Sequence, residues 1–172
     1  EVNVDALDWA HRRPLIEKEI AFHAPDLLCV QELQGTAEGK GEGDHHAELG
    51  AALAEHGYEH RYVRKVKRDG SSWPHAQIGN AIFWRSASFA YVEHEEVLIA
   101  PLLNGACDDE QSRAYFCRGA QVGLVVVLRH VRTARTVVVV TTHLSCNFQE
   151  PVTQIAQIHT VLAAAARVVE RH

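Results

Sequence analysis

Two residues with the chemistry of a phosphate-processing site follow apolar segments of the chain. Glu32 comes just after the run Leu-Leu-Cys-Val at 27–30, and His143 comes after a run of valines and threonines at 137–142. A rigidly held carboxylate can bind Mg²⁺, which usually shares one or two carboxylates with several waters. An imidazole beside it can stabilise charge that develops on a phosphate oxygen during in-line displacement. Glu32 and His143 are therefore candidate catalytic residues, and Glu32 is also the candidate metal ligand.

Glu32 and His143 could also have purely structural roles, and other residue combinations could form a site. An acid at a strand end is often a solvated turn residue, and a histidine there can bond a backbone group. Ser145 and Cys146 could pair with His143 as nucleophiles, but adjacent strand residues point to opposite faces. The glycine-rich segment 39–43 lacks P-loop spacing. The basic segments 61–68 and 129–135 could contact a phosphate backbone or simply be solvated surface.

Composition and charge limit the function classes. The 172 residues are 47% hydrophobic and 23% charged, which is typical of a globular chain. We find no apolar run near the ~20 residues that cross a bilayer, so no membrane contact is expected. The net charge of −5 argues against a surface that coats nucleic acid, but a bound cation could still attract phosphate. Four widely spaced cysteines without zinc spacing favour a reducing, intracellular setting, cytoplasmic or mitochondrial.

Helices and strands alternate in a pattern that would place these residues on a sheet. Helices are expected at 12–22, from 47 to near 57 and from 151 onward, and strands at 27–30, 58–66, 78–85, 90–99, 121–128 and 136–144. Segments 67–77 and 101–111 combine glycine, proline and polar residues and are expected to be loops. The several consecutive strands favour an α+β sheet sandwich flanked by helices over a doubly wound parallel sheet.

An ordered set of short blocks resembles the endonuclease/exonuclease/phosphatase superfamily. The deadenylase-like branch, with nocturnin, the angel proteins and the mitochondrial 2′-phosphodiesterase, is the most similar. The blocks are Trp9 to Ile16 with its Trp-x-x-Arg-Arg pattern, Glu19-Ile20, Pro25 to Leu33, Gly57-Tyr58, Gly79 to Arg85, Thr141 to Leu144, and Gln154 with Gln157. The resemblance covers nearly the whole chain.

The resemblance implies a fold and a site. The fold would be the α+β, four-layer α/β-β/α sandwich of DNase-I-like proteins, with this chain supplying roughly the first half. Glu32 would bind the catalytic Mg²⁺ or Mn²⁺, and His143 would contact the scissile phosphate. Asn80 is a candidate wall residue of the substrate site, and Asn147 lies in the expected substrate-lining loop. Gln121 falls near a position where deadenylases carry asparagine.

The family blocks Gly-Asp-x-Asn and Ser-Asp-His do not occur in these 172 residues. Residues 1–172 are therefore expected to form an incomplete domain that lacks the first strand and the C-terminal catalytic blocks. A missing C-terminal half or a protein partner would pack on the open sandwich face. The expected function is part of a metal-dependent phosphodiesterase, a 3′ exoribonuclease or deadenylase acting on RNA. Two alternatives are a catalytically degenerate binding module in a ribonucleoprotein assembly and a phosphatase or phosphodiesterase on a lipid or nucleotide.

Overall fold

Two three-stranded antiparallel sheets pack face to face in the computed structural model, which describes residues 7–35, 43–71, 78–117, 119–146 and 151–172. The first sheet has the order β1-β3-β2 and the second has the order β4-β5-β6. The strands are β1 (Leu27–Gln34), β2 (Tyr58–Arg64), β3 (Ile78–Arg85), β4 (Phe89–Leu98), β5 (Val122–His130) and β6 (Thr136–Thr142).

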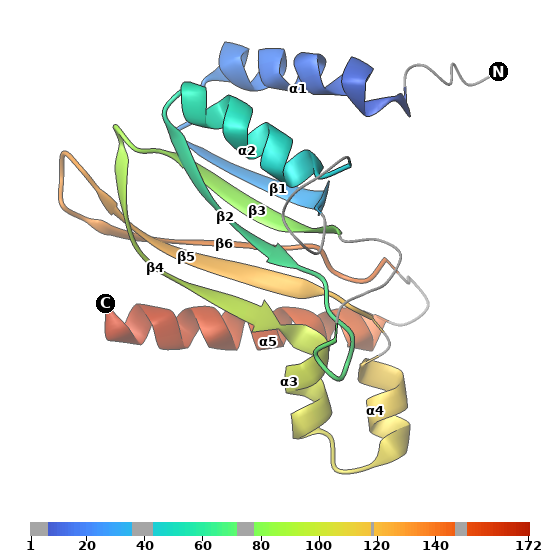
Figure 1. The fold of residues 1–172 in the computed structure, drawn as a ribbon. Coiled ribbons are helices and arrows are strands. Elements are labelled where there is room, and N and C mark those ends of the chain that lie inside the picture. The colour runs from blue at the N-terminus through green and yellow to red at the C-terminus, as the bar shows by residue number, and fades with distance from the viewer. Residues whose placement is uncertain (1–6, 36–42, 72–77, 118, 147–150) are drawn as a thin grey trace.

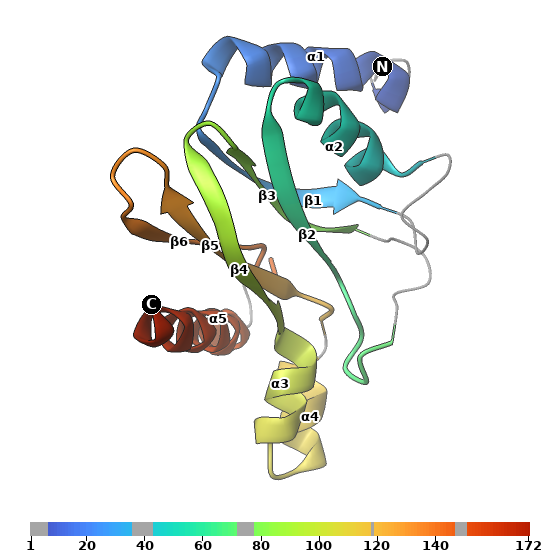
Figure 2. The same cartoon turned by 60° about the vertical axis from the view of Figure 1, so that its left-hand side comes forward.

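Helices cover the outer faces of both sheets and complete four layers (Figures 1 and 2). On the first sheet lie α1 (Trp9–His23) and α2 (His45–Glu55), and on the second lies α5 (Pro151–Arg171). The short helices α3 (Ile99–Ala106) and α4 (Glu110–Phe116) extend beyond the end of β4. The predicted four-layer α+β sandwich is confirmed.

The core between the sheets is built by the two central strands. Six of the eight residues of β3 and the first seven residues of β5 are buried. Such continuous burial is expected for strands covered on both faces, and it explains why both strands are apolar runs without alternation. Ile82 and Trp84 of β3 meet Leu124, Val126 and Leu128 of β5 in one cluster between the sheets.

Helix α5 packs closely on its sheet. Val161, Ala164 and Val168 are buried against the second sheet. A Cβ added to Gly123 of β5 would come 2.9 Å from a Val161 methyl, so this glycine allows the helix to approach the strand.

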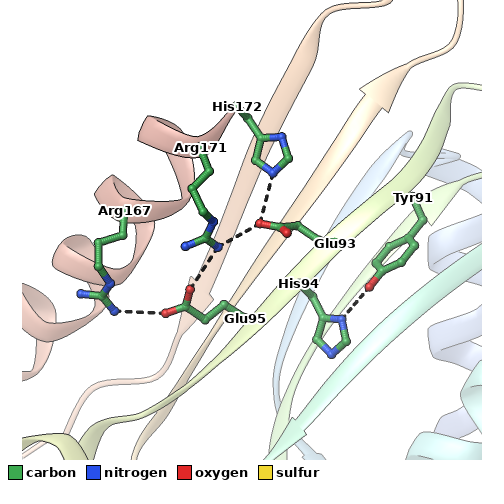
Figure 3. Close-up of polar contacts among 7 residues, drawn as sticks. All are labelled: Tyr91, Glu93, His94, Glu95, Arg167, Arg171 and His172. Carbon is green, nitrogen blue, oxygen red and sulfur yellow. Dashed lines mark hydrogen bonds and ion pairs between the residues drawn. The ribbon is translucent and has the colours of Figure 1, made fainter.

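Ion pairs fasten the far end of this helix. Arg167 and Arg171 pair with Glu93 and Glu95 of β4, and His172 reaches Glu93 (Figure 3). The contacts of Glu93 and Glu95 therefore bind the last turn of α5 to the edge strand of the second sheet.

Two sequence-based expectations need correction. Residues 101–111 are not a loop, because α3 carries Pro101 in its first turn, where proline is tolerated, and Asp109 caps α4 by accepting from the Ser112 N–H. Strand β1 does not end at Glu32 but continues to Gln34. Helix α5 is long and apolar enough to cross a membrane by length and composition, a test that a core helix also passes.

Candidate active site

Glu32 lies in a β-bulge rather than at a strand terminus. Val30 is paired with Ala81 and Leu33 with Gly79, so the two residues between them on β1 face only Asn80 on β3. Glu32 has a φ of 58°, in the left-handed region. This conformation costs on the order of 1 kcal/mol for a residue with a Cβ, and bulges beside functional sites re-aim a side chain. The bulge turns Glu32 out of the regular alternation of the strand.

Three charged or titratable groups converge at this bulge. Lys65 Nζ lies 2.5 Å from Glu32 Oε1, and His143 Nδ1 lies 3.3 Å from the same oxygen. The His143 contact has ion-pair distance but lacks hydrogen-bond geometry, since Nδ1 has no hydrogen-bond partner among the described residues. Lys65 is only 12% exposed, whereas Glu32 and His143 are 47% and 40% exposed. The structure therefore brings Glu32 and His143 to the same edge of the sandwich.

The surroundings favour the charged form of Glu32. The hydrogen bond from Lys65 is the largest influence and lowers the pKa of the carboxyl group below its usual value. Partial burial opposes this shift, while the charges of Lys65 and His143 add to it. At neutral pH Glu32 is therefore a carboxylate in a partly enclosed, positively charged setting.

Asn80 lies behind the bulge and is fully buried. Its Nδ2 donates to the Val122 carbonyl oxygen over 2.8 Å and so links the two sheets. Its Oδ1 is buried without a hydrogen-bond partner among the described residues. This position makes Asn80 a support for the bulge, and the substrate contact expected of it stays a prediction.

The segment after His143 is fixed by glutamines of α5. Gln157 Oε1 accepts from the Ser145 N–H at 2.9 Å, and Gln154 Nε2 donates to the Ser145 carbonyl at 2.6 Å. Gln157 is 2% exposed, so the clamp is largely out of water. The two glutamines therefore hold the backbone two residues beyond His143. Asn147, the other expected substrate contact, lies outside the described residues.

The edge strands β1 and β6 are also connected directly. Gln31 Nε2 of β1 donates to the Thr141 hydroxyl of β6 over 2.8 Å. Within the second sheet, Thr142 Oγ1 donates to the Val122 carbonyl of β5 over 2.9 Å. A cavity of about 240 Å³ lies along β1 beneath α1, and Glu32 is among its lining residues. Within the described residues, β1 pairs with β3 and β6 pairs with β5, so both strands have an open edge.

The donor set suits a divalent cation only in part. Glu32 supplies one ionised and half-exposed carboxylate, and Mg²⁺ commonly takes one or two carboxylates and fills its other positions with water and phosphate oxygens. Within the described residues, no group of three or more His, Cys, Asp or Glu side chains gathers to hold a metal. Further ligands would have to come from solvent, substrate or another polypeptide segment.

Lys65 and the bulge were not identified from the sequence. Lys65 stands in a run with Arg61, Arg64, Lys67 and Arg68, and nothing in the spacing separates it from its neighbours. The bulge left a weak signal, because Gln31 and Glu32 interrupt an apolar run that resumes at Leu33. Pairing within β1 and β3 decides both features, and that pairing depends on the tertiary structure.

Known proteins share this architecture and parts of this sequence. No family model matches the chain. Carbon catabolite repressor protein 4 homolog 2 of Arabidopsis thaliana is 34% identical over 93 residues, which is 54% of this chain and 14% of that protein. The 3′-5′-exoribonuclease subunit Ccr4 of the Yarrowia lipolytica CCR4-Not complex is 26% identical over 81% of this chain and 20% of its own length. Protein angel homolog 2 of Danio rerio is 28% identical over 96% of this chain and 26% of its own length.

Solved structures agree with these relatives. The structure of ANGEL2, a 2′,3′-cyclic phosphatase, matches with a TM-score of 0.75 and 25% identity over 96% of this chain and 40% of its own. An endonuclease/exonuclease/phosphatase from Beutenbergia cavernae matches with a TM-score of 0.62 and 25% identity over 87% of this chain and 38% of its own.

Fold and sequence together define the class. The architecture is that of an α/β-β/α sandwich whose open edge carries a carboxylate, a lysine and a histidine. In sequence and in fold the chain is similar to members of the endonuclease/exonuclease/phosphatase superfamily, among them Ccr4 and angel proteins. It spans between 14% and 26% of the length of these curated relatives.

Proposed function

We propose that residues 1–172 form one part of a metal-dependent phosphodiesterase domain that acts on RNA. The observation that carries the proposal is the convergence of Glu32, Lys65 and His143 at a strained bulge between two sheets. Names of relatives add the substrate class, since the Yarrowia relative is a 3′-5′-exoribonuclease subunit. Metal, substrate and residue roles are all part of the proposal.

Each group at the bulge would have a separate role. Glu32 would be the carboxylate that holds Mg²⁺ or Mn²⁺, and the cation would supply Lewis-acid stabilisation of a phosphoryl oxygen when bound. Lys65 keeps Glu32 ionised and fixes its direction before the cation binds. His143, half-exposed beside Glu32, could donate a hydrogen bond to the phosphate of the scissile bond.

The rest of the site would come from a polypeptide segment that covers the β1/β6 edge. The open edges of β1 and β6 lie side by side, joined by the hydrogen bond from Gln31 to Thr141. Four successive valines of β6, 137–140, are only partly buried, which is typical of an edge that another strand covers. A C-terminal half of the domain, or a protein partner, would extend both sheets here and bring the remaining ligands to Glu32.

Glu32→Gln tests this function in the full-length protein. The change keeps size and hydrogen bonding but removes the charge that would hold the cation. Mg²⁺-dependent hydrolysis of an oligoadenylate should fall on the order of 100-fold or more. The melting temperature without metal should stay near that of the parent, and the stabilisation that Mg²⁺ gives the parent should be lost.

Glu19→Gln is the matched control, because Glu19 is a 73% exposed glutamate on α1, distant in sequence from the bulge. Hydrolysis that remains unchanged in Glu32→Gln at limiting Mg²⁺ would contradict the metal-binding role. A parent protein that binds RNA but hydrolyses none would instead favour a degenerate binding module. That outcome would agree with the lack, among the described residues, of a group of three or more His, Cys, Asp or Glu side chains that could hold a metal.

A second substrate class is supported by the match to ANGEL2, a 2′,3′-cyclic phosphatase. The same carboxylate and histidine could serve a terminal cyclic phosphate instead of an internal linkage. Comparing an oligoadenylate that ends in a 2′,3′-cyclic phosphate with one that ends in a hydroxyl separates the two activities. Parallel assays with a phosphoinositide and a nucleotide cofactor would show whether a smaller phosphate ester is the substrate.

A further inference from the structure

The turn that joins β5 to β6 gathers unpaired positive charge. Arg129, Arg132 and Arg135 are all exposed, and none contacts a carboxylate among the described residues. Ion pairs with glutamates are made instead by arginines elsewhere, namely Arg13, Arg68, Arg113, Arg167 and Arg171. In a chain of net charge −5, three free guanidinium groups within seven residues form a local basic surface, the arginine hairpin (residues 129–135).

The backbone of the arginine hairpin is internally fixed. His130 N–H donates to the Arg135 carbonyl at 2.9 Å, and Ala134 N–H donates to the His130 carbonyl at 2.8 Å. Thr133 N–H donates to His130 Nδ1 at 3.2 Å, which closes the turn with a side-chain cap. Ala134 has a φ of 56°, in the left-handed region, and this conformation lets the chain turn back into β6. A fixed backbone presents the three arginine side chains from constant positions, and so lowers the backbone part of the entropy cost of binding.

Neighbouring segments support the hairpin without neutralising it. Val131 N–H donates to the Ser88 carbonyl at 2.9 Å, so the turn between β3 and β4 braces the hairpin. The Ser88 hydroxyl in turn donates to Asp26, while Glu93 is paired with Arg171 and His172. The carboxylates at this end therefore have partners of their own, and the three arginines remain available.

The hairpin is remote from the bulge. Arg129 and Thr136 pair at one end of the second sheet, whereas Gly123 and Thr142 pair at the other, beside His143. His143 is seven positions after Thr136 and directly follows the last residue of β6, so extended backbone places the two about 24 Å apart. Figures 1 and 2 both show the β5–β6 turn at the end of the sandwich opposite to the C-terminal end of β6. A ligand group held at the hairpin is thus not the one that would react at Glu32.

We infer that the arginine hairpin is a second nucleic-acid contact, which binds the phosphate backbone of single-stranded RNA away from the catalytic edge. Guanidinium groups match phosphate oxygens bidentately, and their contacts position a strand without reading its bases. A flexible strand can touch one basic turn of an acidic protein, whereas a flat anionic membrane would also meet the net charge of −5. The inference rests on RNA as the substrate class of the proposed function.

Binding of a single-stranded oligoadenylate of about 20 nucleotides at several salt concentrations tests the inference. Arg132→Gln with Arg135→Gln removes two free charges that lie outside the strand pairing. Affinity should fall about 5- to 10-fold near 0.1 M salt, and the salt slope of log K should become shallower by about 1.4, the value for two single-strand phosphate contacts. Binding of an adenosine dinucleotide, too short to join hairpin and bulge, should be unchanged.

Arg167→Gln with Arg171→Gln is the matched control, because it removes the same charge from the same end of the fold but from arginines already paired with glutamates (Figure 3). Equal losses in both double variants would overturn a hairpin-specific contact. If an acidic peptide or anionic vesicles bound the arginine hairpin and RNA did not compete with them, the assignment of RNA as the ligand would be overturned. Hairpin-dependent binding without hydrolysis would contradict the proposed catalysis while supporting this contact.

Discussion

The two outer helices α1 and α5 are attached to their sheets in different ways. Helix α5 buries five residues, Thr153, Gln157, Val161, Ala164 and Val168, along one face. Helix α1 buries none, and its large apolar residues Leu15 and Phe22 are 56% and 81% exposed. Ile16 and Ile20 of α1 are only partly buried against the first sheet. Burial therefore holds α5, whereas α1 depends more on polar contacts.

The difference matters because the weakly packed helix lies over the candidate site. The cavity of about 240 Å³ beneath α1 is lined by Glu32, and β1 has its open edge here. Local stability follows the amount of apolar burial, and functional segments are commonly drawn from the less stable parts of a fold. The firmly packed α5, by contrast, holds the segment after His143 through Gln154 and Gln157. Helix α5 therefore fixes the segment that follows His143. Helix α1, beside Glu32, is held less firmly and is expected to be the more mobile of the two.

Truncating one apolar side chain in each helix should give the largest contrast. Val161 of α5 is fully buried and packs on Gly123 of β5. Val161→Ala should therefore lower the free energy of unfolding by about 2 kcal/mol. Ile16→Ala in α1 removes more atoms but from a partly exposed site, and should cost about 1 kcal/mol or less. Urea denaturation of both variants measures the difference. Equal losses would show that α1 is held by burial after all.

Acid should weaken the sheet under α2 through half-buried histidines. His60 of β2 stacks on Phe83 and contacts His46 of α2, and the charge of Arg61 also acts on it. Asp44 and Tyr62 lie on the other side of this group, where both interact with His46. Burial is the main cause that lowers the pKa of His60 from 6.5 to about 4, helped by the charges of His46 and Arg61. The unfolded chain therefore binds the proton more readily than the folded one.

This linkage has a definite sign and pH range. The stability contributed by neutral His60 is complete above pH 6.5 and is lost as the pH falls toward 4, by about 2 kcal/mol after allowance for partial exposure. Unfolding free energies at pH 7 and pH 4.5 should show this loss in the parent and a smaller loss in His60→Gln. His159→Gln, at an exposed position of α5, is the control and should follow the parent. A parallel decline in all three proteins would assign the acid sensitivity to other groups.

Much of the fold could be predicted because its strands are strongly patterned. The runs at 78–85 and 121–128 were both predicted as strands, and they are the central strands β3 and β5. Helices α3 and α4 were missed because each has only eight or seven residues, and glycine and polar residues around them favour a loop. Their stability comes from capping and from tertiary contact, neither of which is visible in local composition.

The candidate site could be predicted only in outline. Glu32 and His143 were selected because both follow apolar runs, and the structure brings them to one edge. Lys65 could not be selected, because its contact with Glu32 depends on a bulge that skips one residue of pairing between β1 and β3. The burial of Asn80 was also missed, since a polar residue in an apolar strand can face either way. The pairing register of β1 with β3 decides both the contact of Lys65 with Glu32 and the burial of Asn80. This register depends on how the strands pair, which the local sequence does not show.

The smallest expected effect concerns the polar link between α1 and α2. Glu48 Oε2 accepts from Trp9 Nε1 and from Arg13 Nη1, each at 2.9 Å, and these contacts join the two helices. The side chains of Arg13 and Glu48 are 38% and 35% exposed, so water screens their attraction. Glu48→Gln should therefore leave the urea midpoint almost unchanged.

The same substitution should nevertheless loosen α1 locally. Because α1 has little apolar burial, the loss of the charged contacts should let its amides exchange several-fold faster, while those of α5 keep the rate of the parent. Native-state hydrogen exchange on both helices makes the measurement, with Glu19→Gln on the exposed surface of α1 as the control. Slower or equal exchange in α1 would mean that the partly buried Ile16 and Ile20 alone hold the helix. Helix α1, which lies beside Glu32, would then be held as firmly as α5.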